Sequence, residues 1–190
     1  TDAWRSGTWV IASLSLRTSK RVLCALVPPS TVIDLSGPLA DEYTDQMIIA
    51  NDSYMADIAL RSLAPIAIEN SNKFQRYIKR VPHGAVLVVA PWNYPYMTAI
   101  NAVAPALIAG NVVLLKHATQ TILVGERLAK AFHQAGVPAD VFQNLYLDHA
   151  TTVQLIAHKS FGFVNFTGSV GGGRAIEQAA AGSFTGLGLE

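Results

Sequence analysis

The second half of the chain alternates short apolar runs with longer stretches whose apolar positions have helical spacing. The short runs, rich in β-branched and aromatic residues, predict strands at Ala85–Ala90, Asn111–Lys116, Val141–Leu147, Gly162–Phe166 and Gly186–Glu190. The stretches between them predict helices at Tyr96–Ala109, Ile122–Ala135, Thr151–His158 and Gly171–Ala181. Strand and helix in alternation are typical of an α/β protein, in which a doubly wound parallel sheet has helices on both faces. The nearly continuous apolar character of the strands agrees with burial on two sides.

The first 80 residues have a less regular pattern. Residues 39–68 carry apolar side chains at roughly helical spacing, which predicts a surface helix covering the sheet; they are Met47, Ile48, Met55, Ile58, Leu63 and Ile66. The segment Lys73–Val81 mixes basic and aromatic residues, and we expect a solvent-exposed extended ribbon there rather than an anion site. Residues 1–36 show no convincing period and are broken by Pro28-Pro29. The sequence therefore predicts two parts: residues 1–80 form a helical and ribbon segment that packs on the sheet, and residues 81–190 form an α/β domain.

Composition excludes several classes of partner. Of the 190 residues 51% are hydrophobic, and the formal net charge is +1, which gives no electrostatic basis for binding nucleic acid or anionic lipid. The longest apolar stretches, such as Ala85–Ala90 and Ala102–Ala109, are too short to span a bilayer, and no secretory signal is present. We therefore expect a cytoplasmic protein. The mitochondrial matrix stays open, because an upstream targeting segment could precede a chain that starts without Met.

The single cysteine and the scattered histidines indicate neither a thiol nucleophile nor a metal site. Cys24 lies in the apolar run from Val22 to Val27, which favours a neutral, buried thiol over a catalytic thiolate. One cysteine allows no internal disulfide, as expected in a reducing compartment. No clustered ligand pattern appears among the histidines outside the motifs, which we expect on the surface or in loops; they are His83, His133, His149 and His158.

Four segments contain residues that could bind a ligand or take part in catalysis. Each falls at the end of a predicted strand or the start of a predicted helix, the edge where open α/β sheets bind ligands. Prolines on both sides of Trp92 and Asn93 make a rigid loop that can present an amide to a substrate oxygen, or a simple turn with a packed Trp. In the second segment, Val113 to Thr119, a strand delivers a lysine and a hydroxyl to this edge, and Lys116 taken alone is expected to be solvated. The glycine-rich segment from Phe166 to Arg174 suits a phosphate at a helix start or a plain tight turn, and Gly186 to Glu190 indicates nothing alone.

Together these segments resemble, in order and spacing, the aldehyde dehydrogenase superfamily. That family is marked by P-W-N-x-P, P-A-L-x-A-G-N, a strand ending in lysine, A-G-x-P, F-T-G-S-x-x-x-G and L-E-L-G-G-K. The matching segments are Pro91–Pro95, Pro105–Asn111, Lys116, Ala135–Pro138, Phe166–Gly173 and Leu189-Glu190. The resemblance covers residues 80–190 without a gap and extends weakly to about residue 38. Arg80–Tyr96 and Lys116–Thr121 are most similar to semialdehyde dehydrogenases.

The resemblance implies a Rossmann-like dinucleotide-binding domain and a role for each matching residue. Asn93 matches the amide that stabilises the oxyanion, and Glu190 matches the general base that activates water to hydrolyse the thioester. The other matches concern the cofactor, NAD or NADP: Trp92 and Asn93 at its cleft, Lys116 and Thr119 at the adenosine ribose, Gly168 and Ser169 at the pyrophosphate. Because Thr119 is neutral and lies beside Lys116, where many NAD-preferring members have glutamate, we expect NADP to be accepted well.

The sequence departs from the family pattern at important positions. The family's nucleophilic cysteine lies beyond the L-E-L-G-G-K segment, whose second residue here is Glu190, and Cys24 matches no motif position. His117 stands where the family usually has proline, and we expect it to be a partly exposed loop residue. Residues 1–36 match the family's usual amino-terminal helices poorly. No position matches a metal ligand.

The resemblance implies NAD(P)-dependent oxidation of a small-molecule aldehyde or semialdehyde to a carboxylate, through a cysteine thiohemiacetal and a thioester. The chain would supply the cofactor-binding part, Asn93 and Glu190, and would be inactive alone because it lacks the cysteine. A homo-oligomer is expected for the full-length protein, with no nucleic-acid or membrane partner. The alternative is a non-catalytic domain, derived from such an enzyme, that binds a dinucleotide or a partner chain.

Overall fold

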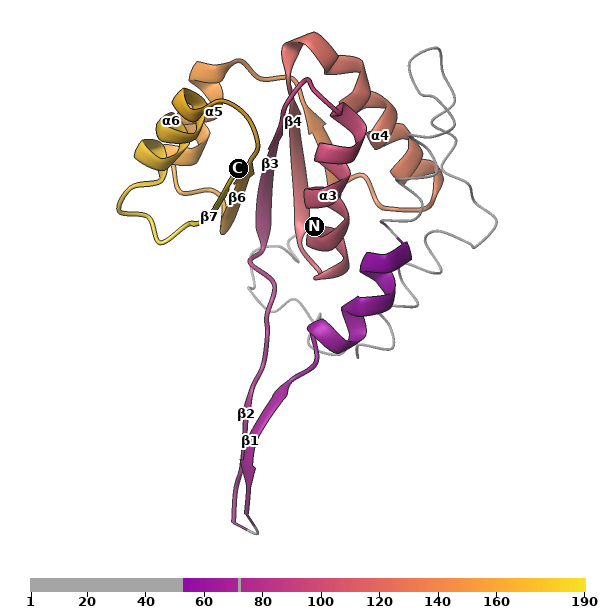
Figure 1. Cartoon of the computed structure of the whole chain (residues 1–190), viewed down its shortest axis with the longest axis vertical. Helices are drawn as coiled ribbons and strands as arrows, with labels where there is room; N and C mark the ends of the chain where they lie inside the picture. Colours follow the sequence, from indigo (N-terminus) through magenta and orange to yellow (C-terminus); the bar gives the residue numbers. More distant parts are fainter. Residues whose placement is uncertain (1–52, 72) are drawn as a thin grey trace, which may run out of the picture.

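The centre of the molecule is a five-stranded parallel sheet with helices on both faces (Figure 1). The computed structural model describes residues 53–71 and 73–190, so Cys24 and the segment 1–36 lie outside the described residues. The sheet has the order β5-β4-β3-β6-β7, with every neighbouring pair parallel. Its strands are β3 (Ala85–Ala90), β4 (Val112–His117), β5 (Phe142–Leu145), β6 (Phe163–Phe166) and β7 (Gly186–Leu189).

Helices cover the sheet in two pairs, and each pair has its own core. The helices are α3 (Pro95–Ile108), α4 (Ile122–Gln134), α5 (His149–Ala157) and α6 (Val170–Ala180), with a short 3-10 helix, η2 (Thr119–Thr121), before α4. Side chains of α3 and α4 pack with Val86, Val88 and Leu115 on one face, while Ile156 of α5 and Ile176 of α6 pack on the other. The prediction of a doubly wound Rossmann-like α/β fold is confirmed.

All the strands and helices predicted between residues 85 and 190 are present, with ends shifted by at most a few residues. The direction of the chain reverses across the sheet between β3 and β6, because β4 and β5 follow on one side of β3 and β6 and β7 on the other. In open α/β sheets this switch point creates a crevice at the carboxyl ends of the strands, where ligands bind. The fold therefore places the Pro91–Pro95 loop and the turn after Phe166 at one crevice.

A two-stranded antiparallel ribbon projects away from the sheet (Figure 1). It is formed by β1 (Ile66–Asn70) and β2 (Gln75–Ile78), which confirms an exposed, extended conformation in Lys73–Val81. The helix predicted for residues 39–68 is wrong at its end: residues 53–62 are helical, and Ile66 begins β1. Pro65 explains the early stop, since a proline disfavours helical backbone at the residue before it. Arg80 Nη1 donates a hydrogen bond to the Ala64 carbonyl at 3.2 Å, at the base of the ribbon.

Candidate functional site

A cavity of about 730 Å³ lies at the carboxyl ends of β3, β4 and β6, within the size range of small-molecule and cofactor sites. Every site residue predicted from the sequence lines it: Trp92, Asn93, Lys116, Thr119, Gly168, Ser169 and Glu190. Sequence reasoning missed other lining residues, which come mainly from η2 and α5: Gln120, His149, Thr152 and Val153. We call this the cofactor cavity below. Its walls come from segments that follow five different strands.

The loop after β3 is held in a strained, defined shape. Tyr94 has a φ of 45°, a left-handed conformation that is uncommon outside glycine, and Pro95 then starts α3 with its fixed φ. Thr98 Oγ1 lies 3.0 Å from the Asn93 carbonyl and 2.6 Å from the Tyr94 carbonyl, both of which can accept its hydrogen bond. Trp92 and Asn93 are exposed at the cavity, and Trp92 keeps 61% of its surface in solvent. The loop can therefore present both side chains to a ligand.

The glycine-rich turn begins α6 with a side-chain cap. Ser169 is the N-cap residue, and its Oγ accepts a hydrogen bond from the Gly172 N–H at 3.2 Å. A helix start leaves further N–H groups without intrahelical partners, and together with the helix dipole these favour an anion such as a phosphate. The Gly168 N–H is not one of them, because it donates to the Glu190 carbonyl at 3.0 Å. Gly168 therefore contributes through its missing side chain: a Cβ there would lie 2.8 Å from Phe166 Cζ.

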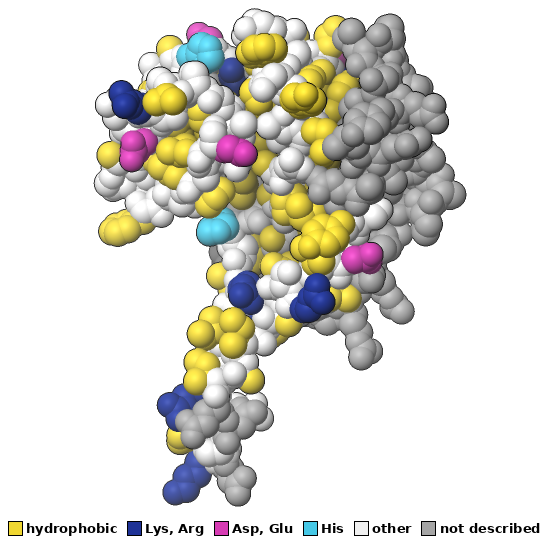
Figure 2. Space-filling model, in the orientation of Figure 1, with side chains coloured by type: hydrophobic (Ala, Val, Ile, Leu, Met, Phe, Trp, Pro, Cys, Tyr) yellow, Lys and Arg dark blue, Asp and Glu magenta, His cyan; other side chains and the backbone are white. Residues whose placement is uncertain are grey.

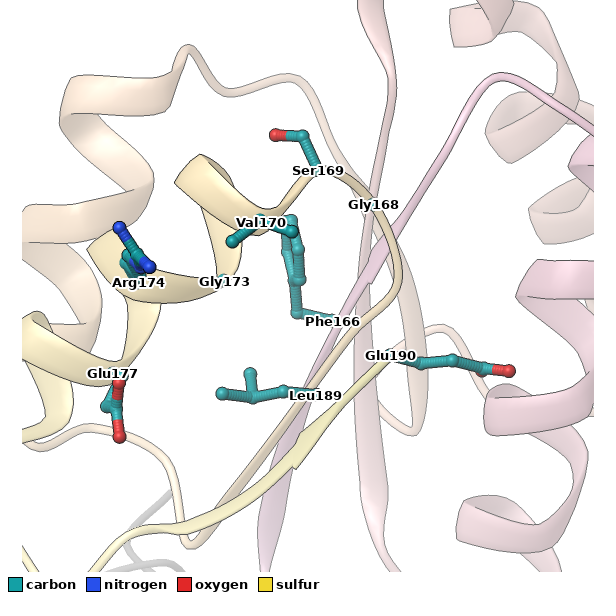
Figure 3. A pocket seen from close by; sticks show the side chains of 9 residues that line it. All are labelled: Phe166, Gly168, Ser169, Val170, Gly173, Arg174, Glu177, Leu189 and Glu190. Atoms are coloured by element: carbon teal, nitrogen blue, oxygen red, sulfur yellow. The ribbon is translucent and has the colours of Figure 1, made fainter.

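Glu190 reaches the cavity because the ends of β6 and β7 are joined. The Glu190 N–H donates to the Phe166 carbonyl at 2.9 Å, and this bond fixes Glu190 beside the glycine-rich turn. On the other side of that turn lies a smaller pocket, where the Phe166 ring packs beneath the start of α6 (Figure 3). The Glu190 side chain points away from Arg174 and Glu177 of α6 (Figure 3). Its carboxylate is exposed and free to face a ligand in the cofactor cavity.

Lys116 is buried, and the expectation that the lysine alone would be solvated is wrong. It is the fifth residue of β4, pairs with Val89 and Leu145 in the sheet, and is only 2% exposed. Burial lowers the pKa of its ammonium from the usual value, and the nearby carboxylate of Asp148 opposes that shift. No hydrogen bond to Lys116 Nζ is made by the described residues. A cation at a cavity wall without such a partner suits an anionic or hydroxyl-rich ligand.

Replacing Lys116 by methionine is expected to raise the free energy of unfolding by about 0.5–2 kcal/mol, as removal of a functional but costly side chain often does. Methionine keeps the length and packing of the side chain without a charge to desolvate. The same variant should bind dinucleotide more weakly. Urea titration and a dinucleotide titration measure the two effects, with Lys130→Met on the exposed part of α4 as the control. A less stable Lys116→Met variant with unchanged dinucleotide affinity would contradict both claims, that the buried charge costs stability and that Lys116 contributes to binding.

His117 is also buried, and the prediction of a partly exposed loop residue is wrong. It is the last residue of β4 and is 3% exposed. Nε2 lies 3.1 Å from the Pro95 carbonyl, and Nδ1 lies 3.0 Å from the Ala118 N and 2.9 Å from Thr121 Oγ1. Burial is the main cause that lowers the pKa of His117. The hydrogen bond to Pro95 raises this pKa, and the neighbouring Lys116 charge lowers it further. The ring is therefore neutral near neutral pH.

The start of α5 forms the wall that the sequence did not reveal. Asp148 caps this helix, and its Oδ1 accepts from the Thr151 N–H at 2.7 Å. The backbone hydrogen bond from Thr151 is the largest cause that lowers the pKa of Asp148, followed by the hydrogen bond from the Thr151 side chain. Asp148 is therefore a carboxylate at neutral pH. Thr152 is 3% exposed, and its Oγ1 donates to the Asp148 carbonyl at 2.6 Å. The aspartate that begins a helix pattern is the only sequence signal that could have indicated this wall.

No group of metal-binding side chains occurs among the residues that the structure describes. Within the same residues, no helix is long and apolar enough to cross a membrane. The cavity's chemistry comes instead from an amide, a carboxylate, a lysine and a helix start, and these fit a dinucleotide. The helix start suits its phosphates, and Lys116 with Thr119 suits the ribose and any phosphate on it.

Residues 31–190 match the family model described as the aldehyde dehydrogenase family, and the chain belongs to this family. It is 31% identical over 163 residues to the D-glyceraldehyde dehydrogenase (NADP(+)) of Picrophilus torridus, covering 84% of this chain and 33% of that protein. It is 40% identical over 114 residues to a betaine aldehyde dehydrogenase of Rhizobium etli, covering 60% of this chain and 23% of that protein. The chain thus spans about a quarter to a third of the length of these curated relatives.

Solved structures give the same family. The succinic semialdehyde dehydrogenase of Streptococcus pyogenes, in complex with NADP+, superposes with a TM-score of 0.74 at 26% identity. That match covers 92% of this chain and 41% of the other. An aldehyde dehydrogenase of Burkholderia cenocepacia superposes with a TM-score of 0.72 at 29% identity, over 92% of this chain and 37% of the other. The resemblance predicted from the motifs is confirmed.

Proposed function

We propose that the chain is the dinucleotide-binding part of an enzyme that oxidises an aldehyde to a carboxylate with NADP or NAD. The observation that carries this proposal is one cavity that gathers all the site residues expected from the motifs, from separate strand ends. The bound dinucleotide would accept the hydride, and the protein supplies binding and orientation. On this proposal residues 81–190 form the dinucleotide-binding domain and residues 1–80 a helical and ribbon segment that packs on the sheet.

Two lining side chains have catalytic roles in this proposal. Asn93 donates a hydrogen bond to the oxyanion that forms when a cysteine thiolate attacks the aldehyde, a contribution of roughly 3–4 kcal/mol in comparable sites. Glu190 takes a proton from the water that hydrolyses the thioester. Support comes from exposure: both side chains are open to the cavity, and each is fixed through the backbone rather than through its own polar atoms. The amide and the carboxylate therefore remain available to the reacting groups.

A semialdehyde is the finer hypothesis for the substrate. It is supported by the N-succinylglutamate 5-semialdehyde dehydrogenase of Novosphingobium aromaticivorans, 40% identical over 104 residues and covering 55% of this chain and 22% of that protein. The succinic semialdehyde dehydrogenase structure points in the same direction.

The chain alone is expected not to oxidise aldehydes, because no cysteine occurs among residues 53–190 and Cys24 matches no motif position. Without a thiol, no thiohemiacetal forms, and Asn93 has no oxyanion to stabilise. The assay is NADPH or NADH formation by the purified chain with a panel of aldehydes. Robust turnover that survives Cys24→Ser would overturn the assignment of roles. A non-catalytic dinucleotide-binding domain is the remaining candidate, and turnover by the full-length protein excludes it.

Replacement of Thr119 by glutamate tests the preference for NADP. Thr119 begins η2 and is exposed at the cavity near Lys116, so a carboxylate there would repel a ribose phosphate while still accepting from ribose hydroxyls. The expected result is that NADP binds at least about tenfold more weakly, or 1.4 kcal/mol, with NAD affinity little changed. Titrations at fixed salt measure both, and Thr119→Gln controls for size. Equal weakening of NADP and NAD, or equal effects of glutamate and glutamine, would contradict this assignment.

We also infer that the full-length protein is a homo-oligomer. The ribbon of β1 and β2 exposes apolar side chains, among them Ile68, Phe74, Tyr77 and Ile78, all more than half in solvent. Figure 2 shows this apolar surface along the projecting ribbon. Such an exposed apolar ribbon supports a protein contact. Light scattering of the full-length protein tests the inference, and a monomer at micromolar concentration would contradict it.

A further inference from the structure

His117 lies behind the wall of the cofactor cavity and contacts two of its segments. It is not a lining residue, and its imidazole is buried between the end of β4 and the start of α3. On one side, Nε2 lies 3.1 Å from the carbonyl of Pro95, which directly follows the Trp92–Tyr94 loop. On the other side, Nδ1 lies 3.0 Å from the Ala118 N and 2.9 Å from Thr121 Oγ1.

Only one protonation state of the ring satisfies these contacts. The Pro95 carbonyl can only accept, so Nε2 carries the proton and donates it. The Ala118 N–H can only donate, so Nδ1 has a free lone pair and accepts, with the Thr121 hydroxyl as a second donor. An imidazolium would turn an Nδ1–H toward the Ala118 N–H. The neutral Nε2–H tautomer is therefore fixed by the geometry of both segments.

We propose that His117 is a positioning residue that couples the loop carrying Trp92 and Asn93 to the turn carrying Thr119. The proposal rests on the function proposed for the cofactor cavity. Each hydrogen-bond partner of the ring is a lining residue or lies within two residues of one. A proline at this position, as the family usually has, provides neither the donor nor the acceptor. The coupling is thus a property of chains that have histidine here.

The test combines three variants of the 190-residue chain with one control. His117→Phe removes all three hydrogen bonds of the ring, His117→Gln offers a donor toward Pro95, and His117→Asn offers an acceptor toward Ala118. His133→Gln is the control, because His133 also bonds a carbonyl, that of Phe142 at 2.9 Å, but lies on α4 outside the cavity lining. The readouts are NADP affinity by titration and the fluorescence anisotropy of Trp92 after Trp4 and Trp9 are changed to phenylalanine.

His117→Phe is expected to weaken NADP roughly three- to tenfold and to lower the anisotropy of Trp92, because the loop gains mobility. His117→Gln and His117→Asn should each restore part of the loss, while His133→Gln matches the parent. A purely structural role would lower the melting temperature without moving the Trp92 signal. Folded His117→Phe with unchanged affinity and unchanged anisotropy overturns the proposal.

The ¹⁵N NMR spectrum of histidine-labelled parent chain keeps the proposal falsifiable if a variant does not fold. The His117 ring must appear as the neutral Nε2–H tautomer at neutral pH, and an Nδ1–H tautomer or an imidazolium overturns the network. If the parent binds no dinucleotide, the proposed function fails, while the NMR tautomer and the Trp92 anisotropy still decide the role of His117.

Discussion

Glu190→Gln in the full-length protein is expected to lower the steady-state rate of aldehyde oxidation by roughly 10²–10⁴-fold, the usual contribution of a general base. Glutamine keeps the shape of the side chain and cannot accept a proton from water. In the proposed mechanism hydride transfer precedes hydrolysis, so each site should still form one NADPH rapidly before the reaction slows. Stopped-flow measurement of the burst, followed by the steady-state rate, gives both values.

Glu177→Gln is the matched control for this experiment. Glu177 is another exposed carboxylate of the same neighbourhood, but it lies on α6 and does not line the cofactor cavity. This control should keep the parent's rate and burst. A Glu190→Gln enzyme without a burst would move the base to an earlier step, and one with the parent's rate would remove Glu190 from the mechanism.

Gly168→Val should weaken dinucleotide binding by about 1–3 kcal/mol, or roughly 5- to 150-fold in affinity. The new Cβ would lie 2.8 Å from Phe166 Cζ, so the ring or the turn must shift. Phe166 lines the cavity as well, and the turn holds the start of α6 against Glu190, so either shift alters the wall that faces the phosphates. Calorimetric titration measures the affinity, and circular dichroism shows whether the variant is folded.

The same helix start offers a control glycine. A Cβ at Gly171 has no neighbour within 4 Å, so Gly171→Ala adds a side chain without a collision. Its dinucleotide affinity should match that of the parent. A folded Gly168→Val chain with the parent's affinity would mean that the phosphates bind elsewhere. Equal losses in both variants would point to a general effect on α6 instead.

The parallel sheet could be predicted from the sequence because its strands are buried on both faces. Near-continuous apolar runs such as Ala85–Ala90 contrast with the amphipathic pattern of a helix such as α4, and Gly110 and Gly136 follow the ends of α3 and α4. The strand order depends on long-range pairing and was available only through the general rules for such folds. In the segment before the sheet, the apolar spacing predicted a helix that extends too far, since Pro65 ends the helix and Ile66 begins a ribbon strand.

The candidate site could be predicted only through the combination of motifs. Asn93, Gly168 and Glu190 are unremarkable singly, and their approach depends on a switch point in the sheet. Burial of charged and titratable groups was not predictable, because it depends on partners distant in the chain. His117 is buried because the Pro95 carbonyl and the Thr121 hydroxyl satisfy it. Lys116 is buried because its strand has neighbouring strands on both sides in the sheet.

The most direct test of the account is a calorimetric titration of the folded 190-residue chain with NADP and, separately, with NAD. We expect saturable binding at one site per chain, with NADP bound well, because one cavity brings together all the predicted cofactor-binding residues. Competition between the two dinucleotides should show that they share this site. A folded chain that binds neither dinucleotide at millimolar concentration would contradict the assignment of the cavity.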